Sequence, residues 1–239
     1  MKPVLIIKTG STLKGVPQTR GDFEHWIQAA MGLSDTETIV CNVMAGEILP
    51  KLAEVSALVI TGSAAMVTDQ LPWSQFTENY LREAVIHELP ILGICYGHQL
   101  LAHALGGLVA YHPRGREIGT TSIHLTSAAA TDLLFNELPF SFKVNTSHMQ
   151  TVTKLPNGST VLASNEFESH HAVYFGGRVW GVQFHPEFAL DIMRTYLTER
   201  APALKAEGLD VEQLQASVSA TPIAASLLQR FATLVQKTL

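Results

Sequence analysis

The chain has few cysteines, few charged residues and no long apolar run, and each shortage argues against a class of protein. Its 239 residues include two cysteines, Cys41 and Cys95, too few for a disulfide framework. The net charge of −5 argues against broad binding of nucleic acid, which needs a basic surface. The apolar run at residues 4–7 is too short for a signal peptide or a membrane span. We therefore expect a cytoplasmic protein that binds neither nucleic acid nor membranes.

Metal and cofactor motifs are also missing. His170 and His171 are adjacent, so on a strand they would point to opposite faces and would not share a metal ion. The pair Gly106 and Gly107 follows a helical pattern instead of preceding one, which is the wrong context for a dinucleotide fingerprint. We expect no metal and no cofactor.

Short apolar strands alternate with amphipathic helical patterns in the first hundred residues. This alternation is typical of an α/β fold with a doubly wound, mostly parallel sheet and flanking helices. From Gly119 onward, short strands separated by Asn, Gly and Pro predict an added antiparallel portion. The expected strands are residues 4–7, 38–42, 57–61, 91–94, 121–125, 141–144, 172–175 and 179–184, and the expected helices cover about residues 23–31, 76–85, 99–105, 192–197 and 223–235. Residues 203–219 are predicted as either a helix or a connection.

Cys95 follows an apolar run that predicts a buried strand and precedes a helical pattern that ends at Gly106. The sequence Gly-Ile-Cys-Tyr-Gly around it is typical of a nucleophile elbow, in which a sharp turn between strand and helix carries the reactive side chain. The helix N-terminus beside the sulfur favours the thiolate. Taken alone, Cys95 could equally be a buried core cysteine.

A second motif supplies the groups that a cysteine nucleophile needs. The expected strand at residues 179–184 leads into His185, Pro186 and Glu187. A nucleophile needs a base, and the base needs a group that orients it. The two motifs lie far apart in the chain, so only the fold can join them.

Together, the segments Gly-Ile-Cys-Tyr-Gly-His-Gln and Gly-Val-Gln-Phe-His-Pro-Glu resemble the class I (triad) glutamine amidotransferases, in particular stand-alone relatives of the GMP synthase glutaminase domain. The resemblance covers about residues 40–190. It implies a flavodoxin-like fold and a single domain over residues 1–239, with a catalytic core at about 40–190 and C-terminal helices at about 190–239. By this resemblance Cys95 is the nucleophile, His185 the general base and acid, and Glu187 the orienting carboxylate.

Acyl transfer through a thiolate also needs N–H donors for the oxyanion. The N–H of Tyr96, directly after the nucleophile, is one expected donor. Gly62 and Ser63 end a strand pattern at the place of the family turn that gives the second donor and contacts the substrate. The proline usual in that turn is missing here.

The resemblance also assigns substrate contacts. Gln99 lies one helical turn past the nucleophile and matches a family glutamine that contacts the substrate. Ser147 and His148 match the first half of the family's Ser-His-Gly-Asp loop. Met149 and Gln150 replace its second half, which removes the aspartate expected to hold the α-amino group of glutamine.

Three functions remain open. The first is a hydrolase that attacks a glutamine side-chain amide through a γ-glutamyl thioester and releases ammonia and glutamate. The second is a γ-glutamyl peptidase or hydrolase, which the changes at Met149 and Gln150 favour, and the third is a non-catalytic binding protein of the same fold. The expected substrate is glutamine or a γ-glutamyl small molecule. Because the residues after Glu187 have helical patterns, an ammonia acceptor is expected on a synthetase partner chain in trans, or not at all.

Overall fold

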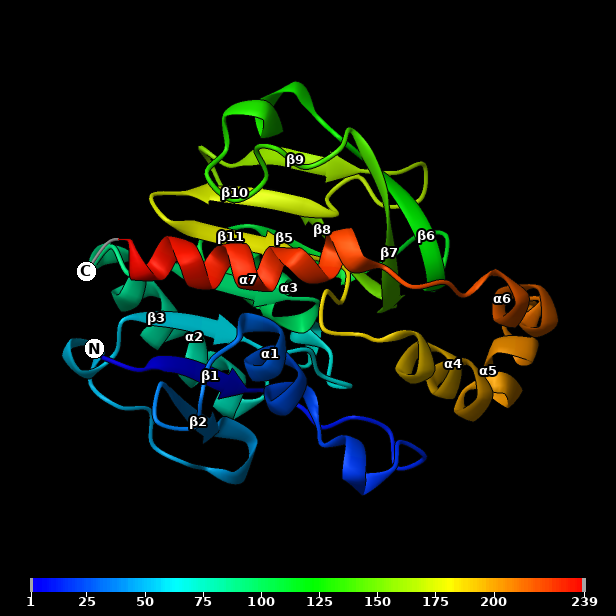
Figure 1. The fold of residues 1–239 in the computed structure, drawn as a ribbon, viewed down its shortest axis with the longest axis horizontal. Coiled ribbons are helices and arrows are strands. Elements are labelled where there is room, and N and C mark those ends of the chain that lie inside the picture. Colours follow the sequence, from blue (N-terminus) through cyan, green and yellow to red (C-terminus); the bar gives the residue numbers. More distant parts are fainter. Residues whose placement is uncertain (1, 238–239) are drawn as a thin grey trace.

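The computed structural model describes residues 2–237, and its main sheet has nine strands in the order β2-β1-β3-β4-β11-β10-β9-β6-β7 (Figure 1). Five strands form the parallel half of this sheet. They are β2 (Thr38–Asn42), β1 (Val4–Lys8), β3 (Ala57–Ile60), β4 (Ile91–Ile94) and β11 (Val179–Val182). The predicted α/β class with a doubly wound sheet is confirmed.

An antiparallel extension continues the sheet beyond β11, as the sequence predicts. It contains β10 (Ala172–Gly176), β9 (Thr160–Ser164), β6 (Glu117–Leu125) and β7 (Ser141–His148). A separate two-stranded sheet pairs β5 (Leu108–Tyr111) with β8 (Gln150–Lys154). The sequence analysis did not predict this small sheet, because β5 is only four residues long and none of them is buried.

Helices cover both faces of the parallel half (Figure 1). One face is covered by α1 (Phe23–Met31) and α7 (Pro222–Gln236), and the other by α2 (Pro72–Ile86) and α3 (Tyr96–Ala104). Successive strand residues point to opposite sides of a sheet, so the core divides into two clusters. In β1, for example, Ile6 packs with the α1–α7 side, whereas Leu5 and Ile7 pack with the α2–α3 side.

A third cluster joins α4 (Leu190–Glu199), α5 (Ala201–Ala206) and α6 (Val211–Ser217) near one end of β6. Residues 203–219 are therefore largely helical. Short 3-10 turns complete the connections: η1 (Gln18–Arg20), η2 (Val43–Ala45), η3 (Leu52–Glu54), η4 (Val67–Asp69) and η5 (Ser127–Thr131). Over residues 2–237, no single helix is long and apolar enough to cross a membrane, and the bent pair α6–α7 meets that test by length and composition only.

Candidate active site

Cys95 occupies the sharp turn between β4 and α3, and its backbone is unusual. Its φ of +50° lies in the left-handed region, which a side chain other than glycine rarely adopts. The Cys95 N–H donates to the Val182 carbonyl oxygen at 2.8 Å, which ties the turn to the end of β11. The structure thus has the strained strand-turn-helix geometry of a nucleophile elbow.

Two glycines permit the close approach of strand and helix at this elbow. A Cβ atom on Gly93 would lie 2.5 Å from the Gly97 carbonyl oxygen. A Cβ atom on Gly97 would lie 2.5 Å from the carbonyl oxygen of Ile60 on β3. Backbone atoms cannot yield at such distances, so both positions require glycine.

Gly97→Ala should therefore destabilise the fold. Overpacking of a filled core costs about 1–3 kcal/mol, and here the obstacle is backbone. Urea unfolding followed by circular dichroism would measure the loss as a lower midpoint with an unchanged slope. A variant as stable as the native protein would contradict the close packing of α3 against β3.

His185 and Glu187 lie beside Cys95 because β11 runs parallel to β4. Parallel neighbours end at the same edge of a sheet, so the residues that follow β4 and β11 meet there. His185 Nδ1 is 2.7 Å from Glu187 Oε1, and both side chains are buried. The imidazole stacks on Phe188 with ring centroids 4.1 Å apart. On another side of the ring, a Cβ atom on Gly62 would lie 2.8 Å from His185 Cε1 and 3.8 Å from Cys95 Cβ, so only glycine fits.

Cys95 and His185 perturb each other's titration. Burial alone would raise the pKa of the Cys95 thiol, but the charge of His185, its hydrogen bond and the charge of His148 bring the net pKa below its ordinary value. Burial alone would lower the pKa of His185, but Glu187 and Cys95 outweigh it and raise that pKa. Both shifts favour a thiolate–imidazolium pair over the neutral thiol and imidazole.

Cys95 should consequently be the reactive thiol of this protein. Burial and the nearby Glu47 raise the pKa of Cys41, so its thiolate forms only at higher pH. At pH 6.5 to 7 we expect iodoacetamide to label Cys95 much faster than Cys41. The labelling rate of Cys41 should increase relative to that of Cys95 as the pH rises. Peptide mass mapping against pH would test this expectation. Labelling mainly at Cys41 in the neutral range would contradict it.

The turn after β3 presents free backbone donors to the site. The Gly62 carbonyl oxygen accepts hydrogen bonds from the hydroxyls of Thr9 and Thr61 at 3.3 and 3.0 Å. In a trans peptide the next N–H points the opposite way, so the Ser63 N–H faces away from these hydroxyls. Neither this N–H nor that of Tyr96 has an acceptor within residues 2–237. The N–H of Gly62, the position predicted from the sequence, has no acceptor there either, so all three are candidate oxyanion donors.

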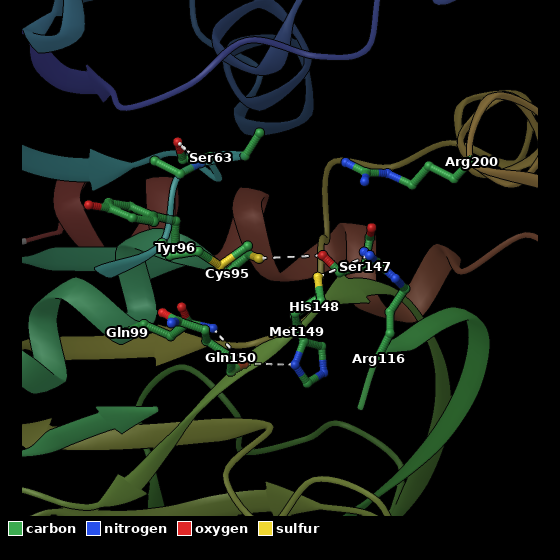
Figure 2. A pocket seen from close by; sticks show the side chains of 13 residues that line it. Ser63, Cys95, Tyr96, Gln99, Arg116, Ser147, His148, Met149, Gln150 and Arg200 are labelled. Atoms are coloured by element: carbon green, nitrogen blue, oxygen red, sulfur yellow. Dashed lines mark hydrogen bonds between the residues drawn. The ribbon is translucent and has the colours of Figure 1, made fainter. Parts of the chain in front are cut away.

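A cavity of about 100 Å³ opens beside Cys95, and most of the predicted substrate-binding residues line it (Figure 2). Ser63, Tyr96, Gln99, Ser147 and His148 all contribute to its wall. Gly62 does not line this cavity, but it lies against the imidazole of His185.

Gln183 was missed by the sequence analysis, although it belongs to the second motif. Its Nε2 donates to Cys95 Sγ at 3.6 Å, and its Oε1 accepts from Gln99 Nε2 at 2.9 Å. Strand periodicity offered a signal, because Gln183 precedes His185 by two residues and so shares its side of the chain.

His148 has no ring nitrogen free for a substrate. Its Nε2 lies 2.9 Å from Glu117 Oε2, and its Nδ1 lies 3.0 Å from the Gln150 carbonyl oxygen. Burial alone would lower the pKa of His148, but Glu117 outweighs it and raises that pKa. With both nitrogens occupied, His148 acts on the site through its charge. Ser147 contributes its carbonyl oxygen, which is 3.9 Å from Cys95 Sγ.

Gln150 does not take the place of the missing aspartate. Its Oε1 accepts from the Val67 N–H at 3.1 Å, and its Nε2 donates to Thr68 Oγ1 at 2.6 Å. These bonds hold the η4 turn over the cavity. Met149 lines the cavity, and its Sδ is 3.0 Å from Arg116 Nη2.

A second, smaller cavity of about 30 Å³ lies on the His185 side. Ser63, Ala64, Ser147 and Arg200 line both cavities, so the two adjoin each other. The remaining wall of the smaller cavity consists of Ser11, Leu13, Phe23, His185 and Tyr196. Sequence reasoning missed Arg116 and Arg200, because neither stands in a recognisable motif. Within residues 2–237, no group of three His, Cys, Asp or Glu side chains is arranged to hold a metal ion.

Comparison with known proteins gives the same family as the motifs. The family model described as glutamine amidotransferase class-I matches residues 20–201. A GMP synthase (glutamine-hydrolyzing) of Thermosipho africanus is 38% identical over 133 residues, which are 55% of this chain and 24% of that protein. A GMP synthase (glutamine-hydrolyzing) of Porphyromonas gingivalis is 36% identical over 173 residues, which are 72% of this chain and 31% of that protein. The chain thus spans about a quarter to a third of the length of these relatives.

Solved structures show the same fold. A glutamine amidotransferase of Thermotoga maritima superposes with a TM-score of 0.79 at 22% identity, covering 98% of both chains. One from Methylobacillus flagellatus gives 0.74 at 22% identity, covering 99% of this chain and 94% of the other. The architecture is therefore that of an α/β amidotransferase. The chain belongs to the class-I glutamine amidotransferase family.

Proposed function

We propose that this protein hydrolyses the side-chain amide of glutamine through a γ-glutamyl thioester on Cys95. The observation that supports the proposal most directly is the meeting of Cys95, His185 and Glu187 at one edge of the sheet, beside a cavity. A protein that only binds a ligand would not need this triad with a lowered thiol pKa.

The proposed reaction has two halves. The thiolate of Cys95 attacks the γ-carbonyl carbon, and the N–H groups of Ser63 and Tyr96 hold the oxyanion. The imidazolium of His185 donates its proton to the amide nitrogen, the C–N bond breaks, and ammonia leaves. His185 then takes a proton from water, whose oxygen attacks the thioester, and glutamate leaves as the thiolate is restored. Glu187 keeps the imidazole oriented and favours its charged form.

The smaller cavity beside His185 favours ammonia as the leaving group. The departing nitrogen must lie near the proton donor, and the cavity of about 30 Å³ on that side holds only a few water-sized molecules. An amino acid or peptide is larger than this cavity. This size is the reason to prefer glutamine over a γ-glutamyl peptide.

The names and lengths of the relatives support a proposal for where the ammonia goes. They are named GMP synthases (glutamine-hydrolyzing), and the match covers only 24% and 31% of their lengths. We propose that residues 1–239 form one amidotransferase domain, whose ammonia passes to a synthetase chain or is released. A thiolate nucleophile needs reducing conditions, which supports the cytoplasm.

Release of ammonia and glutamate from glutamine by the purified protein would test the proposal. The panel should include γ-glutamyl peptides, with acid-quenched intact mass to detect a γ-glutamyl adduct on Cys95. Preference for glutamine supports the proposal, whereas preference for peptides would identify the γ-glutamyl hydrolase instead. Absence of turnover and of adduct, with and without a synthetase, would refute both.

A further inference from the structure

Arg200 lies where the two cavities meet, between α4 and α5. It lines both of them, and Figure 2 shows its side chain directed toward the part of the cavity that holds Cys95 and Ser63. Its backbone N–H bonds to the Tyr196 carbonyl oxygen at 3.0 Å, and its guanidinium lies 5.9 Å from the Tyr196 ring. These contacts hold the side chain at the mouth of the site.

Arg200 has no directly bonded carboxylate among the described residues. Its Nε is buried with no hydrogen-bond partner, and it forms no ion pair with any described residue. Arg116, the other arginine on the larger cavity, has a partner: its Nε and Nη2 donate to the two carboxylate oxygens of Glu207 at 2.8 and 2.9 Å. Glu207 acts on Arg200 only through its charge, which raises the pKa of Arg200.

Apart from the thiolate of Cys95, the rest of the cavity wall adds no negative charge. None of the described residues lining either cavity is acidic, whereas Arg116, Arg200, His148 and His185 are basic. Burial and the neighbouring charge of Arg116 lower the pKa of Arg200 by more than Tyr196, Glu207 and Cys95 raise it, and a bound anion would counter this lowering. Arg200 is half-buried, and its buried Nε–H is a polar group whose lack of a partner is costly unless a ligand supplies one.

We propose that Arg200, with Arg116 beside it, binds a carboxylate of the substrate. A planar guanidinium matches a carboxylate with two parallel hydrogen bonds. The inference rests on the proposed function, since the carboxylate belongs to the molecule whose amide Cys95 attacks. For glutamine it is the α-carboxylate of the glutamyl group, and only for the γ-glutamyl hydrolase alternative would it be a carboxylate on the leaving amine.

Paired charged and neutral substrates test the proposal. L-Glutamine is compared with L-glutaminamide, and γ-glutamylglycine with γ-glutamylglycinamide, with the γ-carboxyl product quantified by chromatography. We expect Arg200→Met to lower kcat/KM about 10- to 100-fold, mainly through KM, for the compounds that carry the bound carboxylate, and to change the compounds that lack it little. Arg200→Lys should have an intermediate kcat/KM, because lysine keeps the positive charge but cannot form two parallel hydrogen bonds to a carboxylate. The matched control is Arg194→Met, an exposed arginine on the same helix, which should behave as the native protein.

The two substrate pairs distinguish which carboxylate Arg200 binds. A selective loss for glutamine over glutaminamide assigns the α-carboxylate, and a selective loss confined to γ-glutamylglycine assigns the carboxylate of the leaving group. Equal losses for all four compounds, L-glutaminamide included, would overturn the proposal, because they indicate a structural role.

Failure of the proposed function would look different, since the native protein would then turn over none of the four compounds. In that case the alkylation of Cys95 tests the carboxylate site. The rate of alkylation by iodoacetate, divided by the rate with iodoacetamide, should be lower in Arg200→Met than in the native protein if Arg200 attracts carboxylates. An unchanged ratio would overturn the carboxylate site.

Discussion

Replacing Cys95 with alanine should reduce glutamine hydrolysis by at least about 10⁴-fold, to the background of the assay. Removal of a nucleophile that acts as one unit with its base costs as much as the loss of the whole unit. Here Cys95 Sγ accepts from the Gln183 amide, and the charge and hydrogen bond of His185 lower its pKa. Glutamate production with a coupled assay measures the loss, and intact mass should show no γ-glutamyl adduct.

The matched control is the other cysteine. Cys41 packs in β2 with the core on the α2–α3 side and has a raised pKa, so Cys41→Ala should keep kcat within about twofold of the native value. Circular dichroism would establish that both variants fold. Turnover that survived in Cys95→Ala but fell in Cys41→Ala would refute the assignment of the nucleophile.

Glu187→Gln should lower kcat by about 10²- to 10⁴-fold while the protein stays folded. The carboxylate is buried, lies 2.7 Å from His185 Nδ1, and is the largest influence raising the pKa of His185. The glutamine amide has the same shape and can still accept a hydrogen bond from His185 Nδ1. The substitution nevertheless removes the negative charge that favours the imidazolium form of His185.

The sign of the pH effect follows from this charge. Without the carboxylate the pKa of His185 falls, so the proton donor for ammonia is lost at a lower pH, and the alkaline limb of the kcat profile should shift toward acid. Glu212→Gln, an exposed glutamate on α6, is the control and should leave the profile unchanged. A Glu187→Gln variant with the native kcat and the native profile would mean that another group orients the histidine.

The elbow shows how much a local pattern can predict. The strand, the turn and the helix around Cys95 are formed by contiguous residues, and Gly93 and Gly97 are needed where strand and helix cross. The pairing of His185 with Glu187 is equally local, since only one residue separates them. Periodicity and motif therefore sufficed for these elements.

The second half of the substrate loop shows the opposite. The sequence comparison treats Gln150 as a changed substrate contact, but its side chain bonds to Val67 and Thr68 on another turn. Its neighbour His148 is held by Glu117 on β6, which no sequence pattern connects to it. Direction and partner of a side chain depend on which strands pair, and that information is not local.

The sequence by itself determined the fold class, the nucleophile elbow and the identity of a Cys-His-Glu set, because apolar periodicity and short motifs record contacts between near neighbours in the chain. Tertiary structure alone decided that β11 lies beside β4, which brings the two motifs together. It also decided that Arg200 enters the site with no carboxylate of the described residues bonded to its guanidinium. In sequence a buried arginine and a solvated one look the same, and only the packing of α4 and α5 beside the sheet distinguishes them.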